Sequence, residues 1–184
     1  MSLAQVDADG RSDKLLMGNF GTPRRFSVLC PNNPAYRSFV VAQLNELCDR
    51  YEFEGVWPDM TFWPMVCFCP SCRERYASDV GGEIPRIIDW EEPVWVRFQR
   101  KRQEWLLEFI HLVTSTIKSR KPEVTVAHQS QTFNHDWLLG PSLAAVEEND
   151  WLSADLCGDR YTISFLGKLF HAVSQKKPFE HLNT

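Results

Sequence analysis

The chain has 184 residues, of which 43% are hydrophobic and 12% aromatic, a composition typical of a globular protein and not of a disordered one. Its 20 basic and 24 acidic residues are mixed along the sequence and give a net charge of −4. This pattern argues against nucleic-acid binding and against a polybasic membrane tail, and it favours a neutral polar ligand.

Met1–Lys14 is polar and has no apolar core, so it does not have the pattern of a secretion signal or an anchor. We expect this segment to be disordered or to come from the cloning vector, and residues 15–184 to form one domain. No stretch of the sequence reaches the roughly 20 apolar residues that a membrane span needs. The sequence therefore predicts a cytoplasmic protein with no membrane partner.

From residue 25 onward, strand and helix signals alternate, which indicates an α/β protein with a parallel sheet. Arg25–Cys30 alternates apolar residues as a strand does. Asn33 is then expected to cap a helix whose first residue is Pro34. Apolar residues three and four apart continue this helix to Tyr51, and Phe53–Asp59 is the next predicted strand.

A second helix is predicted to begin at a capping box formed by Asp89 and Glu92, with Pro93 in its first turn. Cations collect before Pro122, where they suit the negative end of the helix dipole. The remaining predicted elements are strands at Val124–Ala127, Trp151–Leu156 and Pro178–Thr184, and a helix at Ile163–Val173.

Five strands can be placed in this way, whereas a complete eight-stranded barrel takes about 250 residues. The predicted fold is therefore a partial (β/α)8 TIM barrel with about five parallel strands and flanking helices. An exposed last strand would leave unpaired backbone groups. We expect either a fragment of a larger barrel or a homo-oligomer in which another chain completes the sheet.

Three thiols stand within six residues in Cys67-Phe68-Cys69-Pro70-Ser71-Cys72, a spacing typical of metal ligands and not of core packing. Without a secretion signal, clustered cysteines favour a metal site over disulfides. Cys48 and Cys157 are then expected to be buried thiols.

Two parts of the sequence resemble known glycoside hydrolases. The segment Cys30-Pro31-Asn32-Asn33-Pro34 and the later cysteine cluster are similar to β-galactosidases of glycoside hydrolase family 42. The Gly-Val-Trp-Pro-Asp strand and the Lys-Pro-Phe-Glu tail look closer to hypothetical glycosyl hydrolases related to family 29 α-L-fucosidases. The resemblance covers roughly residues 25–184 and implies a barrel enzyme. The family 42 Asn-Glu dipeptide is missing, which argues against the chemistry of that family.

The resemblance to family 42 implies that Cys30, Cys67, Cys69 and Cys72 bind structural zinc. Four thiolates around one zinc ion close a tetrahedron and leave no open position for substrate. The alternative is a group of reduced, buried thiols. No organic cofactor is expected.

Glycoside hydrolysis needs two carboxyl groups, roughly 5 to 5.5 Å apart for retention of configuration or 6.5 to 9.5 Å for inversion. Asp59 lies at the end of an apolar strand, where α/β barrels carry catalytic residues. The resemblance places it where the fucosidase-like barrels carry their nucleophile and where family 42 enzymes carry an acid/base Glu. The alternative is a residue that caps the following loop. Glu180 is the leading candidate for the partner acid. Asp155 and Asp159 are further candidates, which can equally bind a sugar hydroxyl or cap the next helix.

His128 and Gln129 end a predicted strand, where we expect them to hydrogen-bond to sugar hydroxyls. Phe62 and Trp63 follow Asp59 and suit the apolar faces of sugar rings. The predicted function is cleavage of a carbohydrate substrate through paired carboxylates. The competing hypothesis is a non-catalytic carbohydrate-binding or zinc-stabilised remnant of a glycosidase barrel.

Overall fold

The computed structural model of the protein describes residues 3–12, 28–59, 61–129, 137–140, 142–155 and 159–182. The helices are α1 (Pro34–Arg50), α2 (Pro70–Asp79), α3 (Pro93–Arg120) and α4 (Arg160–Val173). The strands are β1 (Gly55–Val56), β2 (Thr125–Val126), β3 (Leu152–Asp155) and β4 (Phe179–Leu182). Two short 3-10 helices, η2 (Trp137–Leu139) and η3 (Leu143–Glu148), precede β3.

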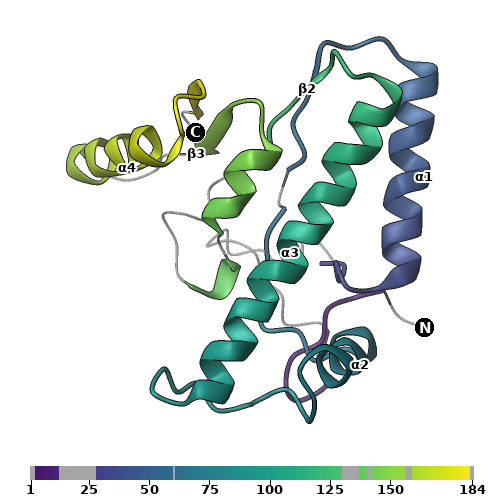
Figure 1. Cartoon of the computed structure of the whole chain (residues 1–184), viewed down its shortest axis with the longest axis vertical. Helices are drawn as coiled ribbons and strands as arrows, with labels where there is room; N and C mark the ends of the chain where they lie inside the picture. The colour runs from purple at the N-terminus through teal and green to yellow at the C-terminus, as the bar shows by residue number, and fades with distance from the viewer. Residues whose placement is uncertain are drawn as a thin grey trace.

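The strands run parallel and follow one another in chain order (Figure 1). β1 pairs with β2, with Gly55 beside Thr125, and β3 pairs with β4 along its full length. An isolated parallel bridge between Gln129 and Ser153 joins the two pairs. This order is that of a barrel segment, and no full barrel is formed by the described residues.

Helix α1 begins as the sequence predicts. The Asn33 side chain accepts hydrogen bonds from the backbone N–H groups of Ala35 and Tyr36, and Pro34 occupies the first turn. These bonds satisfy two of the amides that a helix start leaves without an intrahelical acceptor.

Helix α3 begins at Pro93, but the predicted capping box is wrong. Glu92 is the N-cap residue and its side chain makes no capping hydrogen bond. The Asp89 carboxylate instead accepts from the backbone N–H of Glu91, within the preceding turn.

The first predicted strand, Arg25–Cys30, does not join the parallel ladder in its described part, residues 28–30. Leu29 forms an isolated antiparallel bridge with Ala4. Gln5 is fully buried and its backbone N–H donates to the Val28 carbonyl. Residues 3–5, within the segment where we expected disorder, thus lie against residues 28–30.

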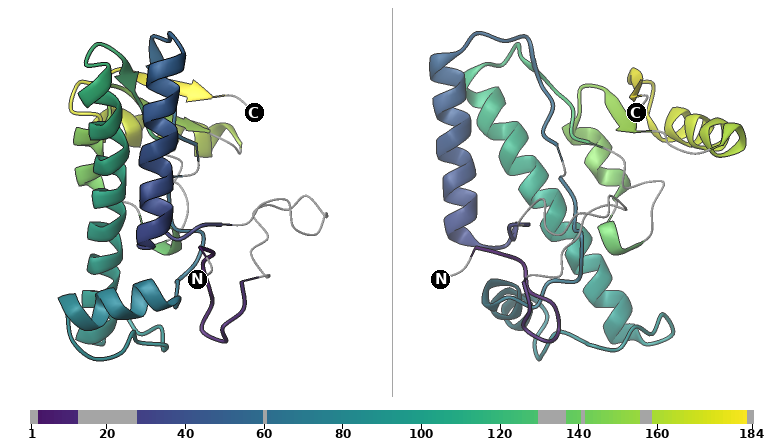
Figure 2. Two further views of the ribbon diagram at one scale, coloured as in Figure 1. Left: turned by 90° about the vertical axis from the view of Figure 1, so that its right-hand side faces the viewer. Right: turned by 180° about the vertical axis from the view of Figure 1, so that it is seen from behind.

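Helices α1 and α3 lie side by side and cover one face of β1 and β2 (Figure 2). The core between them includes Cys48, which is buried as predicted. Helix α4 covers the second strand pair by packing Leu166 and Phe170 against Leu152. Cys157 lies outside the described residues. Both strand pairs therefore pack apolar side chains against helices.

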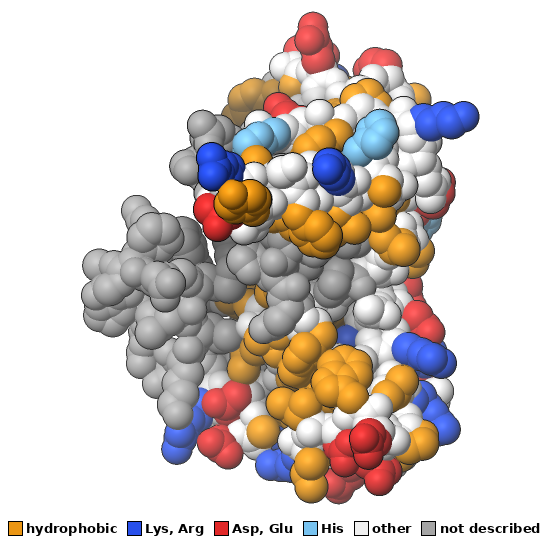
Figure 3. Space-filling model, turned by 90° about the vertical axis from the view of Figure 1, so that its left-hand side faces the viewer, with side chains coloured by type: hydrophobic (Ala, Val, Ile, Leu, Met, Phe, Trp, Pro, Cys, Tyr) orange, Lys and Arg blue, Asp and Glu red, His pale blue; other side chains and the backbone are white. Residues whose placement is uncertain are grey.

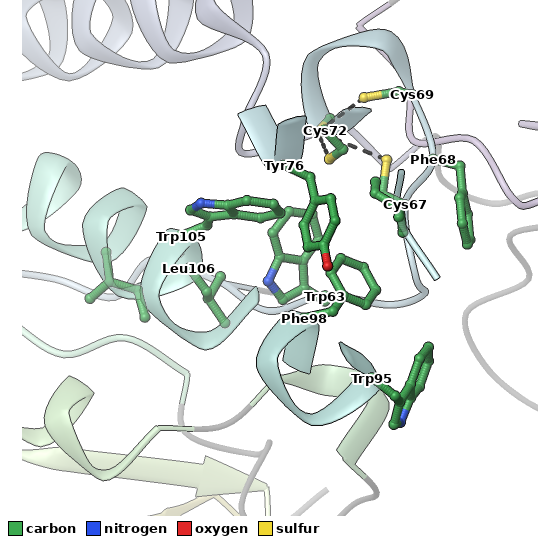
Figure 4. Packing of buried hydrophobic residues seen from close by; sticks show 13 residues of the cluster. Trp63, Cys67, Phe68, Cys69, Cys72, Tyr76, Trp95, Phe98, Trp105 and Leu106 are labelled. Atoms are coloured by element: carbon green, nitrogen blue, oxygen red, sulfur yellow. Dashed lines mark hydrogen bonds between the residues drawn. The ribbon is translucent and has the colours of Figure 1, made fainter. Parts of the chain in front are cut away.

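A third core joins the cysteines to the aromatic half of α3 (Figure 4). It includes Trp63, Tyr76, Trp95, Phe98 and Trp105. Tyr76 belongs to α2, a helix that the sequence analysis did not predict.

Large apolar side chains are also exposed, at the start of α3 and on α4. Figure 3, which looks at the side that carries α4, shows apolar groups in both its upper and lower parts. At these two places the exposed residues are Ile87, Ile88, Trp90, Val94, Tyr161 and Phe165. No described helix is both long and apolar enough to cross a membrane.

Candidate functional site

The cysteines that the sequence singles out meet in the structure. All four, Cys30, Cys67, Cys69 and Cys72, are buried, and their sulfur atoms lie within 4.8 Å of one another. The Sγ atom of Cys30 is 3.5 Å from that of Cys72, 3.5 Å from that of Cys69 and 3.9 Å from that of Cys67. A tetrahedron with Zn–S bonds of about 2.3 Å has edges of about 3.8 Å, whereas bonded disulfide sulfurs are about 2.05 Å apart. The cluster can therefore hold one metal ion.

Two elements far apart in sequence build this cluster. Cys69 is the N-cap residue of α2 and Cys72 lies in its first turn, while Cys30 precedes α1. Figure 4 shows the sulfurs of Cys67, Cys69 and Cys72 gathered at the start of α2. The Asn32 side-chain amide donates to Cys72 Sγ over 3.4 Å, and Arg75 donates to Asn32 Oδ1 over 2.9 Å. Such outer contacts orient metal ligands.

The hydrogen bonds among the buried thiols shift their pKa values in opposite directions. The hydrogen bond with Cys67, together with burial, raises the pKa of Cys30. Hydrogen bonds with the other three cysteines raise the pKa of Cys72. The hydrogen bond between Cys30 and Cys69 lowers the pKa of Cys69. Four thiolates in such a buried place need a cation to offset their charge.

The β ladder aligns polar residues of β3, β4 and the segment after β2 in one row, which reaches the segment after β1. The Gln129 backbone N–H donates to the Pro58 carbonyl over 3.3 Å, which extends the β1–β2 pairing to the residue before Asp59. Gln129 bridges to Ser153, and Ser153 pairs with Glu180. Register partners in parallel strands point to the same face. Gln129, Ser153 and Glu180 therefore share one face.

That shared face is opposite to the helices. Leu152 and Phe179 are the sequence neighbours of Ser153 and Glu180, and both pack in the core under α4. Since successive side chains of a strand alternate between faces, Ser153 and Glu180 belong to the other face. The exposed Glu180 carboxylate accepts a hydrogen bond of 3.1 Å from Trp151 Nε1.

Asp59 is exposed at the carboxyl end of β1, beside a cavity of about 240 Å³. The cavity lies between the start of α1, the middle of α3 and the loop after β1. Its walls include Tyr36, Phe62, Leu106 and Phe109. A strand-end carboxylate therefore borders a mainly apolar hollow.

His128 does not face the row of polar residues, contrary to the prediction that it binds sugar. It is 2% exposed, and its Nε2 atom lies 2.9 Å from Thr114 Oγ1 of α3. Its Nδ1 atom lies 3.3 Å from Thr61 Oγ1. Burial lowers the pKa of His128 to about 4. His128 thus connects β2 to α3, while Gln129 lies in the row.

Trp63 is buried in the core, so we no longer expect it to stack on a sugar. Only 1% of this residue is exposed, and its Nε1 atom donates to the Arg102 carbonyl over 2.9 Å. Phe62 is also buried, but it lines the cavity beside Asp59.

Asp159 is the N-cap residue of α4. One of its carboxylate oxygens accepts from the backbone N–H groups of Tyr161 and Thr162, and the bonds to Thr162 lower the pKa of Asp159. Its capping role was one of the alternatives that the sequence left open. Asp155 ends β3 opposite Leu182, and its side chain is outside the described part of the structure.

No protein-family profile matches the sequence, and no curated protein matches it. Among solved structures, a cold-adapted β-galactosidase from Rahnella sp. R3 is similar with a TM-score of 0.66 and 16% identity over 96% of this chain. A β-galactosidase from Bacillus circulans sp. alkalophilus gives 0.65 and 16% over 94%, and α-L-fucosidase isoenzyme 2 from Paenibacillus thiaminolyticus gives 0.52 and 18% over 82%. The fold is glycosidase-like. The likeness covers 31%, 30% and 20% of those three chains, so this chain spans at most about a third of their length.

Sequence reasoning gave no role to two polar residues, Asn32 beside the cysteines and Arg102 on α3. Asn32 directly follows Pro31 in the segment that holds Cys30, so its nearness to the cluster was a usable signal. Arg102 interrupts the apolar stripe of α3, and the structure buries it among aromatic rings. A charged residue inside a core stripe indicates a polar contact that sequence alone does not identify.

Proposed function

We propose that this chain is part of a glycoside hydrolase that cleaves glycosidic bonds with the carboxyl groups of Asp59 and Glu180. The observation that supports it best is the row across the ladder, which ends in Glu180 on one side and reaches the residue before Asp59 on the other. The glycosidase-like fold agrees with this chemistry.

In such a pair, one carboxyl group protonates the oxygen of the leaving group. The other carboxylate either attacks the sugar or activates a water molecule that does so. Gln129 stands between the two in the row and offers an amide for a sugar hydroxyl. The substrate is therefore a carbohydrate, bound at the carboxyl ends of the strands, with its sugar on the face of the ladder that the helices leave free.

The spacing of the row indicates that this chemistry belongs to a closed barrel. Three strand spacings of about 4.8 Å place the ends of the row roughly 14 Å apart on a flat sheet. Paired carboxyl groups of glycosidases lie roughly 5 to 9.5 Å apart. Curvature of the sheet toward a barrel shortens this distance, because both side chains then point to the barrel axis.

We also propose that the cysteine cluster binds structural zinc. Four thiolate ligands fill a tetrahedral site and leave no position for substrate or water. Bound zinc would tie the segment before α1 to the start of α2, on either side of β1 and Asp59. Its role is then to fix the loop that follows Asp59.

The test is hydrolysis of a panel of chromogenic glycosides by the intact protein. Asp59→Asn and Glu180→Gln should each lower kcat/KM by roughly 100-fold or more on the substrate that is cleaved. Asp49→Asn and Glu123→Gln change exposed carboxylates away from the row and should leave the rate unchanged. If a folded, zinc-loaded protein bound a sugar without hydrolysing any glycoside, this result would contradict the proposed hydrolysis. It would instead support a carbohydrate-binding protein.

A further inference from the structure

We infer that the cavity beside Asp59 is an apolar leaving-group subsite, which accepts the aromatic or aliphatic aglycone of a glycoside and not a second sugar. This inference rests on the proposed function, since it gives that same site its substrate class.

The first support is the chemistry of the cavity walls. Tyr36 stacks on Phe109 with ring centroids 5.6 Å apart and an interplanar angle of 24°. Phe62 and Leu106 complete an apolar lining. Ligand sites usually combine such walls with a few polar groups that fix orientation. Here the charged group at the wall is Asp59.

The second support is the small number of polar groups available to a sugar, since Tyr36, Asp59 and Thr61 carry the polar side chains among the described lining residues. Thr61 Oγ1 already donates to the Pro58 carbonyl over 3.2 Å and lies 3.3 Å from His128 Nδ1. Each sugar hydroxyl that is buried without a partner loses its hydrogen bonds to water. A pyranose carries several hydroxyls, whereas an aromatic or aliphatic group carries none. The cavity therefore favours the apolar group.

The third support is size. The cavity measures about 240 Å³, below the roughly 300 to 1,000 Å³ of sites for drug-sized ligands. An apolar cavity of about 150 Å³ in another protein holds one benzene molecule. One substituted ring therefore fits beside Asp59.

This placement gives Asp59 a defined role. With the aglycone in the cavity, the glycosidic oxygen lies next to the Asp59 carboxyl group, which transfers its proton to that oxygen. The bond between the sugar carbon and this oxygen breaks with its electron pair remaining on oxygen, so the aglycone leaves as a neutral alcohol. The carboxylate of Glu180, or a water molecule that it deprotonates, bonds to the sugar carbon. Asp59 is thus the general acid, whereas the resemblance to the fucosidase-like barrels implies a nucleophile at this position.

The first test measures binding of phenol to the intact protein by ligand-observed NMR, with glycerol as the polar comparison. Val28→Trp fills the cavity from a half-buried wall position, and Val94→Trp makes the same change at a site that is 49% exposed on α3. Phenol should bind better than glycerol, and Val28→Trp should weaken phenol binding at least tenfold while Val94→Trp does not. Equal phenol binding by both variants, or no phenol binding by the wild type, would overturn the inference.

The second test compares kcat/KM for a phenyl and a methyl glycoside of the same sugar. The phenyl-to-methyl ratio should fall at least tenfold in Val28→Trp and stay unchanged in Val94→Trp. An unchanged ratio in an active Val28→Trp variant would overturn the subsite. If the wild type hydrolyses neither glycoside, the proposed function fails, whereas the phenol measurement still decides what the cavity binds.

Discussion

The Sγ atom of Cys30 lies 3.5 Å from the Sγ atom of Cys72, although the two residues are 42 positions apart in the sequence. Between these two cysteines the chain forms α1, β1 and the loop after Asp59. A metal ion at this point would close the whole segment into one unit. The cluster and the strand-end carboxylate are therefore parts of one structural arrangement.

Removal of the metal is predicted to destabilise the protein. We expect one zinc ion per chain, and we expect a chelator or Cys72→Ser to lower the melting temperature, because structural zinc contributes directly to folding. Elemental analysis and thermal melts with and without chelator measure this. Cys48→Ser is the matched control, since Cys48 is buried outside the cluster. A protein with no bound zinc and an unchanged melt would refute the zinc site.

Local signals explain what the sequence predicted correctly. Asn33 and Pro34 fix the start of α1 through backbone geometry that depends on few distant contacts. The cysteine spacing identified the cluster for a similar reason, since the residue type and spacing of metal ligands can be recognised within a short segment. Helix α2 was missed because its start is Cys69 followed by Pro70, and the cysteine there was assigned only to the metal.

Tertiary contacts explain what the sequence left open. His128 and Gln129 are neighbours at the same strand end, and only the pairing register shows that the first contacts α3 and the second joins the polar row. Trp63 lies on a loop, but the loop folds back into the aromatic core. Neither the contact of His128 with α3 nor the burial of Trp63 follows from a local sequence pattern.

Arg102 is predicted to stabilise the aromatic core. It is 2% exposed, and its guanidinium donates to the Met65 carbonyl over 3.1 Å and to the Leu138 carbonyl over 2.5 Å. Arg102→Met should lower the free energy of unfolding by about 2 to 4 kcal/mol, because each carbonyl left without a donor costs about 1 to 3 kcal/mol. Denaturant unfolding measures it. Arg100→Met, at an exposed position of α3, should change stability by less than about 0.5 kcal/mol; equal effects of the two substitutions would contradict this role.

His128 is predicted to make stability depend on pH. Burial lowers its pKa from 6.5 to about 4, so the unfolded chain binds a proton between these values and the folded chain does not. The contribution of His128 is fully present above pH 6.5 and is lost as the pH falls toward 4, at about 1.4 kcal/mol per pH unit.

His128→Gln tests this dependence, since a glutamine does not titrate. Urea unfolding should show the wild type losing about 2 kcal/mol more than the variant between about pH 6.5 and pH 5. His171→Gln changes an exposed histidine of α4 and should keep the wild-type dependence. The same pH dependence in His128→Gln as in the wild type would show that this residue is not its source.

The measurement that tests the central claim most directly is a double-mutant cycle on kcat/KM with Asp59→Asn, Glu180→Gln and the double variant. The substrate is a phenyl glycoside that the wild-type protein hydrolyses. Groups that act as one catalytic unit have strongly non-additive effects, so each single variant should lose nearly as much activity as the double variant, with zinc content and melting temperature unchanged. Wild-type activity in either single variant, or losses that simply add, would contradict a catalytic pair of Asp59 and Glu180.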